Sequence, residues 1–125
     1  MVFRIRTSQK TMAIFEEIRK RENLQPFALA KVSIALAIHS HFLFDGRLED
    51  SNGLDLNRQT ITGDNDLLFK KLIENNEGKS LPEEEYFPNY VKAYLDYGAA
   101  LLEQECKYAN NNDIYCHLVN LDDAI

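Results

Sequence analysis

The sequence has few of the residues that mark a disulfide-stapled, fibrous or disordered chain. Its 125 residues include two cysteines, three prolines, five glycines and no tryptophan. Glycine and proline together reach about half of their usual share, which argues against collagen, flexible linkers and proline-rich disorder. With 45% hydrophobic residues, a chain of this length buries enough surface to fold without disulfides or metal. We therefore expect one globular domain over residues 1–125.

Segments for membrane insertion or export are also missing. No stretch approaches the roughly 18 uncharged apolar residues that a membrane-spanning helix needs. The N-terminus carries Arg4 and Arg6 where a signal peptide would have its apolar region. We expect a cytoplasmic protein with no membrane partner.

The usual catalytic and metal-binding motifs do not occur. There is no Gly-rich phosphate loop, no G-x-S-x-G nucleophile and no H-E-x-x-H zinc motif. His39 and His41 would face apart on a helix, and no further ligand lies at zinc spacing. Cys106 and Cys116 lie in polar, acid-rich sequence, which favours reduced structural cysteines over a redox pair. We expect a protein that is not an enzyme and that uses no metal or cofactor.

The net charge of −6 is distributed unevenly along the chain. Residues 1–40 carry seven basic and three acidic side chains, a net charge of +4. Residues 41–125 carry seven basic and 17 acidic side chains, a net charge of −10. Such an asymmetry points to a polyanion partner for the basic segment. The alternative is that charged residues of a solvated surface are unevenly distributed by chance. Composition alone favours neither explanation.

Hydrophobic spacing and turn residues predict a mainly α fold, with a short N-terminal strand followed by a bundle of about four to five helices. The strand is too short to stand alone and must pair with another segment. The second helix is apolar on nearly every face, which places it at the centre of a core or under another subunit. The expected order is a strand at 2–7, a helix to about Asn23 capped by Ser8, or alternatively by Thr7 or Thr11, a helix at 27–38 after Pro26, a loop at 39–63, a helix from Asp64 or Asn65 to 75–78, an acidic connector at 81–85, and a helix at 89–108 in which Gly98 permits close backbone approach.

Seven cations in the first 31 residues are candidates for contact with DNA. Arg4 and Arg6 would project from one face of the strand, about 7 Å apart. Two such strands, paired antiparallel, would form a basic ribbon that fits a DNA major groove. Cations at the end of a helix also stabilise its dipole, so residues 19–21 have a structural alternative. The candidate DNA-binding residues are Arg4, Arg6, Lys10, Arg19, Lys20, Arg21 and Lys31.

The order strand, helix, turn and helix resembles the ribbon-helix-helix plan of small repressors. A more specific pattern, G-x-[DE]-x-N-R-x-T-x-x-G, begins at Gly53 and is followed by acidic residues and an apolar helix. This block is similar to the signature of the DndE family, small subunits of the bacterial DNA phosphorothioation system. The likeness runs from about Arg4 to Lys107. The matching positions are Gly53, Asp55, Asn57, Arg58, Thr60 and Gly63, with Asp64 and Asp66 after them.

The resemblance implies a small, mostly helical protein without catalysis of its own. It implies homo-oligomers, with tetramers as the reported form, that bind duplex DNA and prefer a nicked duplex. It also implies work beside a cysteine desulfurase, a sulfurtransferase and an SMC-like ATPase, which together replace a non-bridging phosphate oxygen by sulfur.

The motif residues have two interpretations. In the structural one, Asn57 and Arg58 brace a long loop, with Arg58 paired to Asp64 or Asp66. In the other, Arg58 contacts a phosphate. The structural interpretation is favoured because the surrounding acids would oppose a polyanion.

The charge distribution and the resemblance together lead us to expect a non-catalytic DNA-binding and scaffold subunit of the phosphorothioation machinery. Oligomerisation would gather several copies of the basic segment 1–40, while the acidic helical remainder 41–125 faces away or contacts partner proteins. Two alternatives stay open: a ribbon-helix-helix repressor or antitoxin, and an adaptor that touches only proteins. A small nuclease is a more distant alternative.

Overall fold

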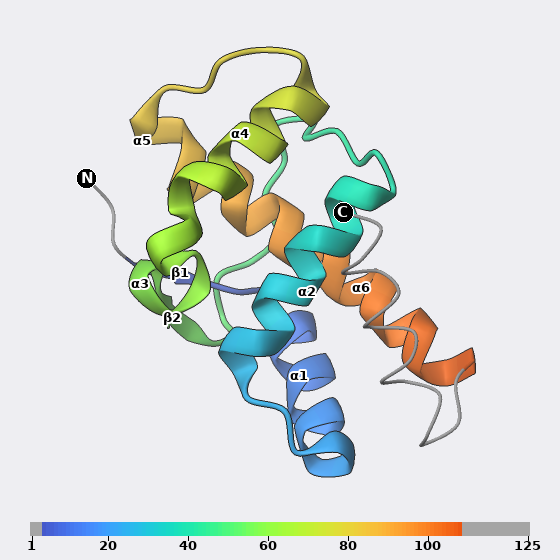
Figure 1. Cartoon of the computed structure of the whole chain (residues 1–125). Helices are drawn as coiled ribbons and strands as arrows, with labels where there is room; N and C mark the ends of the chain where they lie inside the picture. The colour runs from blue at the N-terminus through green and yellow to red at the C-terminus, as the bar shows by residue number, and fades with distance from the viewer. Residues whose placement is uncertain (1–3, 109–125) are drawn as a thin grey trace.

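Helices make up most of the computed structural model, which describes residues 4–108 (Figure 1). Residues 2 and 3 of the predicted strand, and Cys116, lie outside the described residues. The expected fold class, a mainly helical protein with a short N-terminal strand, is confirmed. The elements are β1 (Arg4–Arg6), α1 (Gln9–Glu22), α2 (Pro26–His39), β2 (Asp55–Asn57), α3 (Arg58–Ile61), the 3-10 turn η1 (Gly63–Asn65), α4 (Asp66–Glu77), α5 (Glu83–Glu85), the π-helical turn η2 (Tyr86–Val91) and α6 (Lys92–Tyr108).

The ends of α1 follow from its capping residues. Ser8 is the N-cap, and its Oγ accepts a hydrogen bond from the backbone N–H of Thr11 at 3.0 Å. At the other end Asn23 adopts the left-handed conformation, with φ of 56°, and its N–H donates to the Arg19 carbonyl. Pro26 then begins α2, because the residue before a proline disfavours helical backbone. The predicted end of the first helix near Asn23 is confirmed, and the second helix begins at Pro26, one residue before the predicted start.

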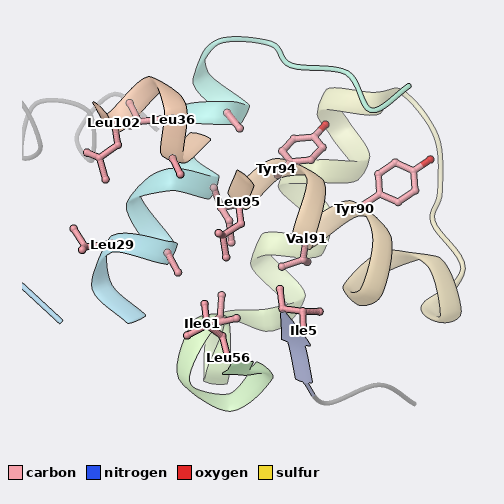
Figure 2. Packing of buried hydrophobic residues seen from close by; sticks show 14 of the residues in the cluster. Ile5, Leu29, Leu36, Leu56, Ile61, Tyr90, Val91, Tyr94, Leu95 and Leu102 are labelled. Carbon is pink, nitrogen blue, oxygen red and sulfur yellow. The ribbon is translucent and has the colours of Figure 1, made fainter. Parts of the chain in front are cut away.

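The centre of the core is the contact between α2 and α6, and Figure 2 shows the apolar side chains gathered there. Gly98 of α6 lies against the backbone of Ser33 in α2, so that a Cβ on Gly98 would stand 1.6 Å from the Ser33 carbonyl oxygen. The predicted close approach at Gly98 is confirmed. Because α2 also contacts α1, α3 and α4, its apolar faces are covered largely by elements of the same chain.

The structure corrects the loop that was predicted at 39–63. Residues 55–57 form β2, which runs antiparallel to β1 with Arg4 opposite Asn57 and Arg6 opposite Asp55. Helix α3 follows directly. Elements of three or four residues carry too little periodicity to be read from the sequence. The strand partner of β1 is therefore a segment of the same chain, whereas the ribbon-helix-helix plan pairs the strands of two copies.

The helix predicted after Asp64 or Asn65 is α4, which ends before Gly78 in the left-handed conformation. Its predicted capping was wrong: Asn65 holds the N-cap position, but its side chain makes no cap hydrogen bond. The 3-10 turn η1 leads into the helix in its place.

The acidic connector is also helical, contrary to prediction. Helical backbone begins at Glu83 and not at 89. Pro88 lies within this helical stretch, although proline lacks an amide hydrogen and its ring clashes with the carbonyl four residues earlier. Pro88 lies inside the π-helical turn η2. Kinks caused by proline and single π-helical turns are both known irregularities of helices.

We predict that Gly98→Ala destabilises the protein by about 3 kcal/mol or more, because backbone atoms of Ser33 occupy the space of the new methyl group. Chemical denaturation followed by circular dichroism measures the change. Gln104→Ala, at an exposed position of the same helix, is the control and should change stability by less than about 0.5 kcal/mol. Equal stability of the two variants would contradict the close contact.

Candidate nucleic-acid interface

A buried ion pair holds the basic N-terminal segment in place. Lys92 and Asp96, one turn apart on α6, lie 2.9 Å from each other with 4% and 7% of their surface exposed. The Lys92 ammonium also donates to the backbone carbonyls of Arg6 at 2.8 Å and of Asp50 at 2.9 Å. Its three protons are therefore all used. The pair thus ties α6 to β1 and to the loop before β2.

The carboxylate of Asp96 secures the start of α1 in turn. Its Oδ1 accepts hydrogen bonds from the backbone N–H of Ser8 at 3.1 Å and from the Thr11 hydroxyl at 2.7 Å. A negative charge at a helix N-terminus is favourable because the helix dipole is positive there. Asp96 therefore fixes the start of α1 against α6, as Lys92 fixes β1.

The glycine that opens the family motif lies at a tight crossing of two backbones. Gly53 N–H donates to the Thr7 carbonyl at 2.8 Å, and Thr7 N–H donates to the Leu54 carbonyl at 2.8 Å. A Cβ on Gly53 would stand 2.1 Å from the Ser8 carbonyl oxygen. Only glycine permits this approach, which sets the register of β2 on β1.

Arg58 connects three helical segments through a partly buried cluster. Its Nε and Nη2 donate to the two carboxylate oxygens of Asp66 at 3.1 and 2.7 Å, and its Nη1 lies 2.6 Å from Glu83 Oε1. The guanidinium also lies over the rings of Tyr86 and Phe87, with 5.4 and 5.0 Å to the ring centroids. Of the two carboxylates considered in the sequence, Asp66 is the partner. The hydrogen bond to Asp66 raises the pKa of Arg58 above its ordinary value.

The other polar residues of the motif also make contacts within the chain. The Asn57 side chain accepts from the Gln59 N–H at 2.7 Å and so caps α3, and the Thr60 hydroxyl donates to the Asn57 carbonyl at 2.8 Å. Asp55 pairs with Arg4 at 3.3 Å. Gly63 has a φ of 50°, a conformation that favours glycine. This geometry supports the structural interpretation of the motif.

The seven candidate DNA-binding cations form two groups. The first, which we call the β1 group, consists of Arg4, Arg6 and Lys10. All three side chains are exposed, and the alternation of β1 turns Arg4 and Arg6 to its outer face. Arg4 shares this face with Asp55, whereas among the described residues no ion pair holds Arg6 or Lys10.

The second group, which we call the turn group, consists of Arg19, Lys20 and Arg21 in the last turn of α1 and of Lys31 in the second turn of α2, the helix that follows. A helix of 14 residues is about 21 Å long, which separates the turn group from the β1 group (Figure 1). Acids accompany the turn group: Arg19 lies 3.9 Å from Glu16, and Arg21 lines one pocket together with Glu17 and Glu103. The seven cations, which lie close together in the sequence, are therefore spread along α1 and beyond both of its ends.

Lys92 and Asp96 were not predicted from the sequence to hold the N-terminal segment in place. The available signal was an i,i+4 pair of opposite charges inside a stretch, 90–96, in which every residue is buried in the structure. Opposite charges at this spacing are common on exposed helix faces, so the spacing by itself does not reveal burial.

Cys106 is buried and unpaired with any cysteine in the described part of the chain, and burial raises the pKa of its thiol above the ordinary value. Within residues 4–106 no cluster of three or more His, Cys, Asp or Glu side chains is arranged to hold a metal ion. None of the helices described is long and apolar enough to span a membrane.

The fold and the exposed cations define a small, mainly helical protein that presents a basic strand face beside its first helix. A family model described as DNA sulphur modification protein DndE matches residues 4–110. The chain belongs to the DndE family, which confirms the resemblance drawn from the sequence.

The fold is that of a solved structure described as DndE from Escherichia coli B7A involved in DNA phosphorothioation modification. The two share 16% sequence identity with a TM-score of 0.64, over 82% of this chain and 98% of that chain. The search of curated proteins found no match.

Removal of the Lys92 side chain should be strongly destabilising. Lys92→Ala leaves Asp96 as an uncompensated buried charge, a change that typically costs about 3–5 kcal/mol. Urea denaturation at pH 7 tests this. The matched control is Lys71→Ala, whose ammonium is paired with Glu74 at i,i+3 but whose side chain is 70% exposed, and which should cost under about 1 kcal/mol. Similar losses in both variants would rule out a central role for the buried pair.

The Asp66 carboxylate should make stability depend on acid pH. Burial acts to raise its pKa, but hydrogen bonds from Arg58 and Thr62 and the charge on Arg58 outweigh burial, so the pKa lies below its ordinary value of 3.8. The corresponding stabilisation is full above the pKa of the unfolded chain, about 3.9, and is lost as pH falls through the lower folded-state pKa.

The test is urea denaturation of the wild type and of Asp66→Asn across this range. We expect the variant to be less stable at pH 7 and the difference between the two proteins to shrink below about pH 4. A difference that is constant with pH would show that ionised Asp66 contributes no such stabilisation.

Proposed function

We propose that this chain is the small, non-catalytic DNA-binding subunit of the cytoplasmic machinery that modifies DNA with sulfur. The observation that carries the proposal is the match of the DndE family model over residues 4–110. The exposed β1 group supports it, because exposed cations hold phosphates and, among the described residues, no ion pair engages Arg6 or Lys10.

The β1 group is the better candidate for the first contact with DNA. Arg6 and Lys10 are exposed, and Lys92 and Asp96 hold the backbone that carries them. This rigid support reduces the entropy that is lost when DNA binds. Arg4, which is paired with Asp55, contributes less, and the turn group supplies a second contact about one helix length away.

Self-association resolves how an acidic chain holds a polyanion. At physiological salt a charge acts over about 8 Å, so only cations close to the phosphates matter, and several copies multiply them. The proposed homo-oligomer, a tetramer in its fullest form, would place the acidic remainder toward partner subunits such as a sulfurtransferase and an SMC-like ATPase. Helix α4 offers an apolar surface for such contacts, because Leu67 and Leu68 are 68% and 56% exposed.

We predict that Lys10→Glu weakens DNA binding several-fold on every duplex sequence and lowers the slope of log affinity against log salt by about 1. Arg6→Glu should act in the same way. Mobility shifts at several salt concentrations, on intact, nicked and gapped duplexes of one sequence, measure both quantities, and the nicked duplex should bind best.

The control is Lys71→Glu, which makes the same charge change at an exposed lysine on α4 and should leave binding unchanged. Equal loss in Lys10→Glu and Lys71→Glu would exclude the β1 group as the site. A preference for one palindrome by orders of magnitude would indicate a repressor instead. No salt-sensitive binding at low ionic strength would indicate an adaptor that contacts proteins alone.

A further inference from the structure

A pocket of about 350 Å³ opens beside the β1 group. Its walls come from the start of α1, from the loop after α2 and from α6, and Lys10 lies on its rim. This volume is in the range of small-molecule sites, far too small for a duplex but sufficient for a single nucleotide.

One wall of the pocket is a fixed aromatic surface. The rings of Tyr97 and Phe42 are stacked, with centroids 4.2 Å apart and planes inclined by 19°. Tyr94 supports Phe42 from behind in an edge-to-face contact at 5.0 Å. Tyr97 nevertheless remains 42% exposed. A large aromatic side chain that is held in place and still partly exposed is a ready stacking surface for another planar group.

The lining charges of the pocket are balanced. Asp96 lies in the lining, but Lys92 neutralises it and its oxygens already accept hydrogen bonds. The remaining charged groups are two cations, Lys10 and Arg47, and two acids, Asp45 and Glu49. A pocket of this kind repels neither sign of charge and offers both hydrogen-bond donors and acceptors. It suits a flat, neutral ligand whose edge carries both kinds of group, which is the chemistry of a nucleobase.

We propose that the pocket receives one unpaired nucleobase, stacked on Tyr97, from DNA whose backbone is held by Arg6 and Lys10. The inference rests on the proposed DNA-binding function and adds to it a contact with a nucleobase. Lys10 belongs to both sites, so backbone and base are contacted side by side. Removing a base from the stack costs least where it is already unpaired or at a strand end, which gives nicked DNA an advantage over intact duplex.

The experiment measures the ratio of affinities for nicked and intact duplex of one sequence. Because the base stacks on the ring of Tyr97, Tyr97→Ala should lower this ratio by about tenfold, which corresponds to about 1.4 kcal/mol. Binding to intact duplex should stay unchanged. Tyr97→Phe keeps the ring and should keep the ratio. Gln104→Ala, at an exposed position of the same helix outside the pocket, should also keep it.

A second measurement changes the DNA and leaves the protein intact. The nucleotide on the 5′ or the 3′ side of the nick is replaced by an abasic one, and one of these replacements should reduce binding to the level of intact duplex. If the ratio of affinities for nicked and intact duplex is unchanged by both abasic replacements, or is 1 for the wild type, the base pocket is excluded. The β1 group would still be a DNA-binding site in that case. Loss of all salt-sensitive binding to duplex overturns the proposed function itself.

Discussion

The buried pair of Lys92 and Asp96 is the interaction on which the arrangement of this protein depends. A buried ion pair is expensive to desolvate, and it is tolerated here because both partners are fully hydrogen-bonded. Those bonds reach β1, the start of α1 and the loop at Asp50, segments that lie more than 40 positions away from α6 in the sequence. One pair of side chains thereby sets the position of the basic N-terminal segment on the helical body.

The family motif, which begins in the loop before β2, holds together a second part of the structure. Gly53 lets two backbones cross, and Arg58 joins α3, α4 and α5 through Asp66 and Glu83. The polar groups of the motif thus make contacts within the chain. Exposed cations of β1 and α1 remain available to a partner. A family signature rich in polar residues can therefore stabilise the fold, while arginines and lysines outside the signature stay exposed.

The longer elements were predictable because their periodicity extends over several turns. Helices α1, α2, α4 and α6 follow from apolar spacing and from Ser8, Pro26 and Gly78 at their ends. The short elements were not: β2 and α3 contain one buried residue each, Leu56 and Ile61, and such a pattern does not differ from that of a loop. The π-helical turn at Pro88 was likewise hidden, since proline ordinarily signals an end.

The sequence by itself determined the helical class, the family and the excess of positive charge near the N-terminus, because these depend on local spacing and residue identity. Only the tertiary structure decided which charges are buried, which carboxylate pairs with Arg58, and how the cations divide between the two ends of α1. It also brought Tyr97, Phe42 and Lys10 around one pocket. These outcomes depend on contacts between residues far apart in the chain, where burial changes the energy of a charge and no local pattern records the neighbour.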